Sequence, residues 1–114
     1  MSFFDSEVVR AEMAEISELQ EEVYNNVFKF PGMTKEDQIH HIELLERLLE
    51  KQRVLYTRLS LSKDPEAQQM KENIIESAKQ MGLPVNVDMQ VVFRNMNDMV
   101  DIMKSQLDKG KHSS

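Results

Sequence analysis

Apolar residues recur along most of this chain at alternating spacings of three and four, the period of amphipathic α-helices. These stripes predict helices over about residues 6–29, 35–60, 65–81 and 88–107. Phe30-Pro31-Gly32 separates the first two, because proline removes a backbone donor and glycine permits a turn. Three glycines, three prolines and little clustering of β-branched residues argue against a sheet.

Short polar residues stand at the predicted helix starts, where their side chains can accept hydrogen bonds from unpaired backbone amides. Thr34 and Asp37 form a variant of the capping box, with aspartate in the usual Glu or Gln position. Pro65 suits the first position of a helix, and Gly82 suits a helix end followed by an apolar contact. The predicted caps are Asp5 or Ser6, Thr34, Asp64 and Asp88.

The sequence therefore predicts an all-α fold with four helices in an antiparallel arrangement. Short connections make sequential helices antiparallel or steeply crossed. The long first and second helices would form a hairpin, and the third and fourth would be shorter. We expect residues 1–108 to form one helical domain, because a single core accommodates a chain of this length. Residues 109–114 are rich in Gly, Lys and Ser and are expected to be a disordered tail.

A polar residue interrupts each long stripe, Gln20 in the first helix and Gln52 in the second. In an antiparallel hairpin the two glutamines could lie at the same level and pair, which would fix the register at some cost in stability. Alternatively, each glutamine faces solvent at a gap in the stripe. The pattern leaves both interpretations open.

The second helix carries an additional apolar row beside its main stripe, so it must contact neighbours on more than one side. A monomer would leave apolar surface of the long hairpin exposed, and large exposed apolar patches usually mark association surfaces. We therefore expect a homo-oligomer, most simply a two-fold dimer. One of the two phenylalanines before the first cap can pack on the first helical turn, and the other can anchor on a second subunit. The candidate interface residues are Phe3, Phe4, Leu44, Leu48, Leu55 and Met99.

Charge is distributed unevenly along the chain. The formal net charge is −6; residues 1–50 carry twelve acids and four bases, whereas residues 51–114 carry eight acids and ten bases. Such a gradient can set subunit pairing or attract a basic partner to one end, although solvated helix faces give the same pattern. The first residues lack the features of a signal peptide, and no apolar run approaches membrane-spanning length. We expect a cytoplasmic protein.

Residues that carry catalysis or bind metals are scarce. Because there is no cysteine, the chain has neither a thiol nucleophile nor a cysteine-based zinc site. It also lacks a glycine-rich phosphate loop and a nucleophile elbow. Asp37 and His40 are spaced like ligands of di-iron bundles, but His41 points about 100° away from His40 and no second such pair exists. We predict no enzyme activity, no catalytic residue, no metal and no cofactor.

Three basic residues, Arg47, Lys51 and Arg58, recur near one azimuth of the second predicted helix. A basic stripe of this kind can contact nucleic-acid phosphates. The interleaved Glu46 and Glu50, the acidic net charge and the missing aromatic platform favour an ordinary mixed surface instead. Direct contact with nucleic acid is the weaker alternative.

Methionine is frequent, and six of the nine methionines lie between Met70 and Met103. The side chain is unbranched and polarizable, so it fills irregular gaps in cores or lines adaptable binding grooves. Most of these methionines fall on core-facing stripes, which favours packing, with a peptide-binding groove as the alternative. Met99 lies off the main stripe of its helix and suits an interface.

Several stretches carry a resemblance: Ser2-Phe3-Phe4-Asp5-Ser6-Glu7-Val8-Val9, Ile42-Glu43, Leu48-Leu49-Glu50-Lys51 and Arg58-Leu59-Ser60-Leu61-Ser62-Lys63-Asp64, and more weakly Met81-Gly82-Leu83. They resemble a family of small uncharacterised proteins from cyanobacteria and their phages. Lys63 departs from the acidic residue that the resemblance leads us to expect there. The family has no assigned activity, so it implies no functional residue; it implies the cytoplasm of a cyanobacterium or of an infected host cell.

Two functions from different classes remain. The first is a non-enzymatic interaction protein (an adaptor, assembly factor or regulator) that dimerises through its long hairpin and binds an unidentified protein partner. The second is a nucleic-acid-associated accessory protein that uses the basic stripe.

Overall fold

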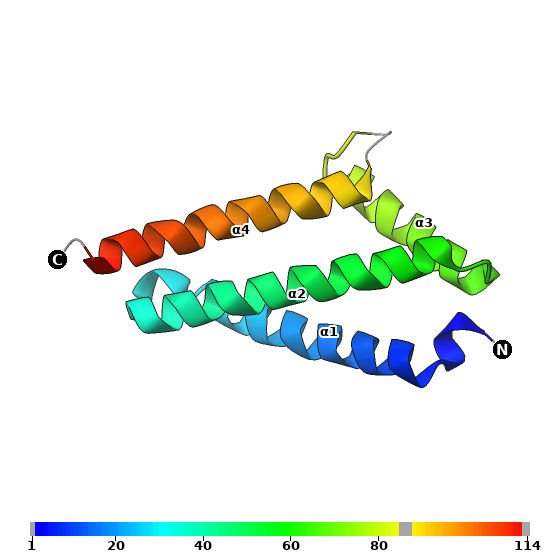
Figure 1. The fold of residues 1–114 in the computed structure, drawn as a ribbon, viewed down its shortest axis with the longest axis horizontal. Coiled ribbons are helices and arrows are strands. Elements are labelled where there is room, and N and C mark those ends of the chain that lie inside the picture. The colour runs from blue at the N-terminus through cyan, green and yellow to red at the C-terminus, as the bar shows by residue number, and fades with distance from the viewer. Residues whose placement is uncertain (1, 85–87, 113–114) are drawn as a thin grey trace.

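The computed structural model describes residues 2–84 and 88–112, and within these ranges the regular structure is entirely helical (Figure 1). The α-helices are α1 (Glu7–Val27), α2 (Lys35–Leu61), α3 (Pro65–Gln80) and α4 (Met89–His112), and two 3₁₀ turns are η1 (Phe3–Asp5) and η2 (Phe30–Gly32). The predicted all-α class with four helices is therefore confirmed. None of the described helices is long and apolar enough to cross a membrane.

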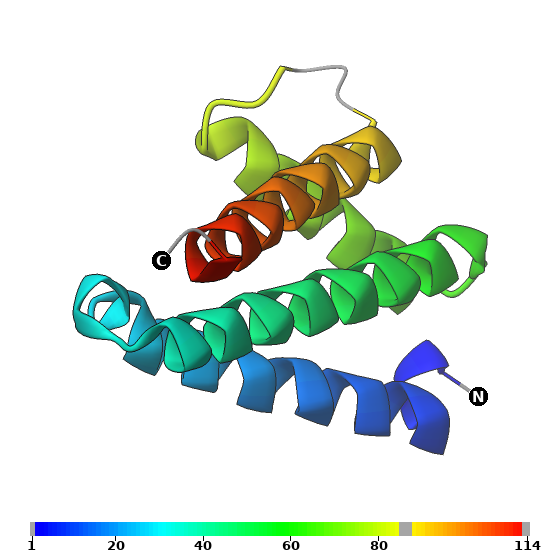
Figure 2. The same ribbon diagram turned by 60° about the vertical axis from the view of Figure 1, so that its left-hand side comes forward.

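The central helix is α2, with α1 and α4 along opposite sides of it (Figure 1). Ion pairs join Arg58 to Glu12 and Lys51 to Glu15, so residues later in α1 meet residues earlier in α2. α4 also runs opposite to α2, and α3 crosses behind α4 at the C-terminal end of α2 (Figure 2). The molecule is elongated, with extents of 56 × 32 × 20 Å.

Of the last two helices, only α4 differs in length from the prediction. α3 is short, with 16 residues, but α4 has 24 residues and is longer than α1, which has 21. The backbone of residues 109–112, predicted to belong to a disordered tail, forms the last turn of α4. A glycine near a helix end costs only about 1 kcal/mol relative to alanine, so Gly110 does not stop the helix. Residues 113–114 lie outside the described residues.

The predicted caps form. Ser6 accepts a hydrogen bond from the Val9 amide at 3.4 Å, and Thr34 accepts one from the Asp37 amide at 3.2 Å. Asp64 and Asp88 accept bonds from the amides two residues later, both at 2.9 Å. Each cap satisfies one of the donors that a helix start leaves unpaired, so the helix starts are fixed locally by sequence.

The leucine row of α2 is buried inside the chain. Leu44, Leu48 and Leu55 pack with Val9 and Ile16 of α1 in one core cluster. The prediction that these leucines face a second subunit is wrong, because α1 covers them. The opposite side of α2 packs on α4 through further buried residues: Ile42, Leu49 and Tyr56 from α2, and Phe93 and Val100 from α4.

The end of α3 is a glycine cap, as its sequence predicts. Gly82 has a φ of 100°, a left-handed conformation that glycine adopts without a Cβ clash. Its amide donates to the Lys79 carbonyl at 3.0 Å, and the Leu83 amide donates to the Ala78 carbonyl at 3.1 Å. This pair of bonds is the Schellman motif. Leu83 then packs against the core cluster between α3 and α4.

Replacing Gly82 by alanine should destabilise the protein by about 1 kcal/mol, because a Cβ is unfavourable in the left-handed region. A Cβ at this position would meet open space, so the backbone conformation alone carries the effect. Gly32→Ala is the control, since Gly32 also faces open space but has no positive φ. Urea denaturation should show a lower midpoint only for Gly82→Ala; equal midpoints would contradict this account.

Candidate interaction groove

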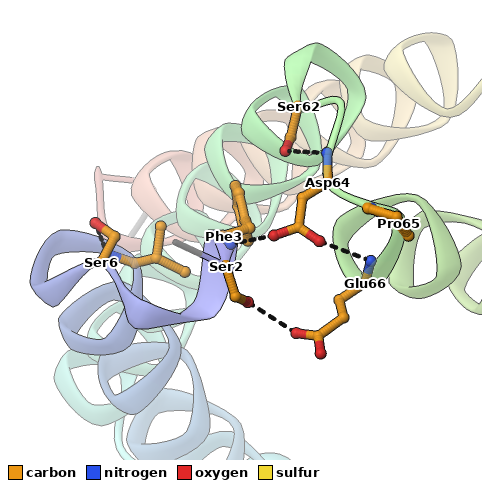
Figure 3. Close-up of a pocket in the computed structure, with 8 residues that line it drawn as sticks. Ser2, Phe3, Ser6, Ser62, Asp64, Pro65 and Glu66 are labelled. Atoms are coloured by element: carbon orange, nitrogen blue, oxygen red, sulfur yellow. Dashed lines mark hydrogen bonds between the residues drawn. The ribbon is translucent and has the colours of Figure 1, made fainter.

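The described part of the chain contains at least two hollows. The first, with a volume of about 900 Å³, lies between η1 and the connection from α2 to α3 (Figure 3). Its polar groups bind one another: the Ser2 hydroxyl donates to Glu66 at 2.8 Å, and the Phe3 amide donates to the Asp64 carboxylate. The Asp64 amide in turn donates to the Ser62 hydroxyl at 3.1 Å. These bonds attach the N-terminal turn to the start of α3.

The N-terminal turn is itself capped. The Ser2 amide donates to Asp5 at 3.0 Å, and the Phe4 amide donates to the Ser2 hydroxyl at 3.2 Å. The spacing Ser2-x-x-Asp5 is a capping-box signal that the sequence prediction missed. The rings of Phe3 and Phe4 meet edge to face, 5.1 Å apart, and both pack against the core cluster of α1, α2 and α3. Both rings therefore pack within the chain. The first hollow is the junction between the N-terminal turn and the start of α3, and its polar groups are occupied by hydrogen bonds within the chain.

Asp64 carries the charge of this attachment. Its carboxylate accepts from the Phe3 amide and from the Glu66 amide, which holds the pKa of Asp64 below its ordinary value. Charge-assisted bonds to backbone amides are stronger than neutral ones. One side chain thus caps both η1 and α3.

The second hollow is a groove of about 750 Å³ to which all four helices contribute. The lining is mostly apolar and includes four methionines: Met70, Met81, Met89 and Met96. None of the described side chains that line it is titratable. Hydrophobic pockets with a few polar groups are typical binding sites, and methionine lets such a surface adapt to its occupant. Met89 is buried, as packing in a core predicts, whereas Met81 and Met96 are exposed.

Gln20 and Gln52 both line this groove, one from α1 and one from α2. Each is half-buried, and no hydrogen bond joins them in the described structure. They do not pair, so they do not fix the register of α1 against α2. The ion pairs Glu12–Arg58 and Glu15–Lys51 instead set Gln20 about one helical turn away from the level of Gln52. Both place polar groups in an otherwise mostly apolar lining.

The basic stripe is largely neutralised within the chain. Lys51 pairs with Glu15 at 2.5 Å and Arg58 pairs with Glu12 at 3.2 Å, so these two bases hold α1 against α2. The hydrogen bond from Lys51 is the main reason that the pKa of Glu15 lies below its ordinary value. Arg47 is exposed on the same side. The structure thus places the stripe at the α1–α2 boundary, where two of its three charges already have partners.

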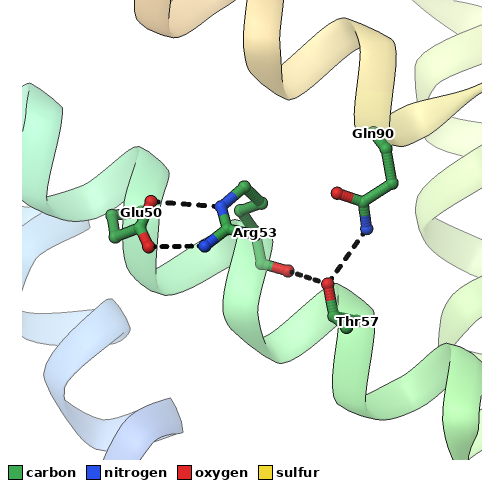
Figure 4. A network of polar contacts seen from close by, with 4 residues as sticks. All are labelled: Glu50, Arg53, Thr57 and Gln90. Carbon is green, nitrogen blue, oxygen red and sulfur yellow. Dashed lines mark hydrogen bonds and ion pairs between the residues drawn. The ribbon is translucent and has the colours of Figure 1, made fainter.

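Another polar network lies between α2 and α4 (Figure 4). Arg53 donates to Glu50 at 2.6 and 3.1 Å on the exposed side of α2. Thr57 donates to the Arg53 carbonyl at 3.0 Å and accepts from the Gln90 amide group at 3.0 Å. Gln90 lies in the first turn of α4, so this bond attaches that turn to α2.

The two central histidines have different surroundings. His41 is 4% exposed and lies 5.4 Å from the Phe30 ring, and burial lowers its pKa, with a smaller contribution from His40. His40 and Asp37 are exposed. Among the described residues no cluster of three or more His, Asp or Glu side chains could hold a metal ion.

Comparison with known protein families gives a match. A family described as a domain of unknown function (DUF1825) matches residues 1–107, which is nearly the whole chain. No curated protein and no solved structure matches this chain. The match includes both hollows but assigns no activity to either.

Asp64→Asn should weaken the protein most at neutral pH. Because the folded pKa of Asp64 is lowered, its contribution is complete above the ordinary aspartate value of 3.8 and is lost as pH falls through the folded value. The variant should therefore have a lower urea midpoint at pH 7 and a smaller loss between pH 5 and pH 3 than the parent. Asp98→Asn, which makes the same charge change at an exposed site on α4, should follow the parent. Parallel pH curves for all three proteins would contradict a role for this carboxylate.

Proposed function

Because the chain belongs to the DUF1825 family, whose function is unknown, we propose a function from its groove: a non-enzymatic protein that binds a protein partner there. The observation that carries the proposal is the uncharged, methionine-rich lining of a groove formed by four helices. An acid–base reaction needs a titratable group at the substrate, and this lining has none.

A helix is the partner element that suits such a groove. Helical partners bind through apolar side chains at spacings of three and four, and methionine-rich grooves accept them because methionine can repack. Gln20 and Gln52 supply the few polar contacts that orient a ligand in an otherwise apolar site. We place this binding in the cytoplasm of a cyanobacterium or phage-infected cell, in keeping with the resemblance of Ser2–Val9 and the other quoted stretches.

Self-association remains part of the proposal, but its surface changes. Leu44, Leu48 and Leu55 are covered by α1, and Phe3 and Phe4 pack within the chain. Of the interface residues that the sequence suggested, Met99 is the exposed one, at 64%. Met99, on α4, is therefore the one residue of that set that an association surface could readily use.

Met96→Glu tests the function directly. A carboxylate in the groove wall should abolish partner binding, because an apolar partner would bury an unpaired charge. Val91→Glu is a matched control: it makes the same change on α4, and the two parent side chains are 43% and 40% exposed, but Val91 does not line the groove.

The measurement is affinity capture from lysate of the source cells, with circular dichroism to verify that both variants are folded. Parent and Val91→Glu proteins should capture the same partner, and Met96→Glu should lose it. Capture of the same proteins by all three baits would contradict binding in the groove.

A further inference from the structure

The corner between α1 and α2 contains a buried imidazole. His41 lies in the first two turns of α2 and is 4% exposed, whereas its neighbour His40 is exposed. The Nδ1 atom of His41 is buried and has no hydrogen-bond partner in the described structure. The imidazole packs against the ring of Phe30 in η2, with 5.4 Å between the ring centroids. A titratable ring is thus enclosed at the corner without a partner for one of its two nitrogens.

Protonation changes what this ring requires from its surroundings. A neutral imidazole can keep Nδ1 as an acceptor, but the imidazolium carries a hydrogen on both nitrogens. Nδ1 of His41 would then be a donor on a charged ring, and no acceptor lies within reach. Burying an unpaired charge costs far more free energy than burying a neutral polar group. The folded corner therefore favours the neutral form of His41.

The charged side chains at this corner do not offset the cost. Lys104 of α4 is already paired with Glu46 at 3.2 Å. The others are exposed: Glu21 and Glu22 of α1, Lys29 before η2, Asp37 and His40 of α2, and Asp108 of α4. Burial is the main cause that lowers the pKa of His41, and the nearby charge of His40 lowers it further. Both causes disfavour the imidazolium.

The contact of Phe30 with His41 is the part of this enclosure that can open at least cost. η2 has three residues, and the Gln38 side chain holds it by donating to the Phe30 carbonyl at 2.9 Å. Lifting Phe30 would expose the imidazole to water while α1 and α2 kept the rest of their contacts. Local openings of this kind need less free energy than global unfolding.

We propose that the His41–Phe30 contact is an acid-sensitive switch: protonation of His41 releases η2 from α2 and loosens the C-terminal half of α4. α4 responds because Phe30 and Leu107 pack against the same core cluster, which contains Val100. Neither His41 nor Phe30 lines the groove, so this switch is a property of the fold beyond the proposed function.

The direction of the effect follows from the linkage between protonation and folding. Because the pKa of His41 in the folded chain lies below its ordinary value of 6.5, the unfolded or opened chain binds the proton more readily. Above 6.5 the ring is neutral in both states, and its contribution does not depend on pH. As the pH falls from 6.5 toward the folded value, the closed corner loses stability.

His41→Leu tests the role of the proton, because leucine is apolar and cannot be protonated. Urea denaturation of the parent should give a lower midpoint at pH 5 than at pH 7, and His41→Leu should lose less over the same range. His40→Leu makes the same change at the exposed neighbour and should stay close to the parent. If His41→Leu loses as much as the parent between pH 7 and pH 5, the switch is overturned.

Hydrogen exchange on the parent chain locates the opening and does not depend on any variant folding. After correction for the intrinsic effect of pH on exchange, amides of residues 30–42 and 100–107 should lose protection at pH 5, whereas those in the middle of α1 should keep theirs. His41→Leu should keep its protection in both segments. A loss spread evenly over the whole chain, or no loss at residues 30–42, would contradict an opening at this corner.

Discussion

The structure depends on α2 being buried on two sides. Leu44, Leu48 and Leu55 face α1, whereas Ile42 and Leu49 pack with Val100 of α4. Burying one leucine or isoleucine contributes about 1.5–3 kcal/mol, so each side of α2 supplies enough free energy to hold one long helix. These two sides of α2 face in different directions. The helices α1 and α4 that cover them are therefore held apart, and a groove remains between them. The groove is thus a consequence of how the central helix is buried.

The short helix α3 closes only part of this opening. At 1.5 Å per residue its 16 residues span about 24 Å, against about 40 Å for the 27 residues of α2. Its position is fixed at both ends by polar contacts and caps. Asp64 joins its start to η1, and the glycine cap at Gly82 turns the chain toward α4. The Thr57–Gln90 bond then fixes the first turn of α4 on α2. Hydrogen bonds between elements, together with the caps, therefore position the groove walls.

Local features of the fold could be predicted from sequence, since caps, turns and stripes are determined by neighbours in the chain. Ser6, Thr34, Asp64, Gly82 and Asp88 all act where their chemistry predicts. What covers a given stripe depends on tertiary packing. Thus Leu48 was correctly expected to be buried, but its cover is α1 rather than a second subunit. Lys51 and Arg58 are basic in any conformation, yet their partners on α1 become visible only in the folded chain.

The groove was the hardest feature to predict, because its side chains come from four helices. The sequence shows a surplus of methionine and two stripes that a glutamine interrupts. By spacing alone, Met96 could lie either with the buried Phe93 and Val100 or with the exposed Met99 and Met103. Only the fold shows that Met89 is buried while Met96 and Met99 remain exposed.

The same fold separates the exposed apolar residues of α4 from the charged surface of the molecule. The acids of α1 and α4 that lie outside the ion pairs, including Glu18, Glu21 and Asp98, are exposed, so net charge opposes nonspecific association of those surfaces. Formal charge is thus concentrated away from the exposed methionines of α4, and the described lining of the groove carries none. This division favours one defined contact over many weak ones, because the acidic surfaces repel other acidic surfaces whereas the uncharged face does not.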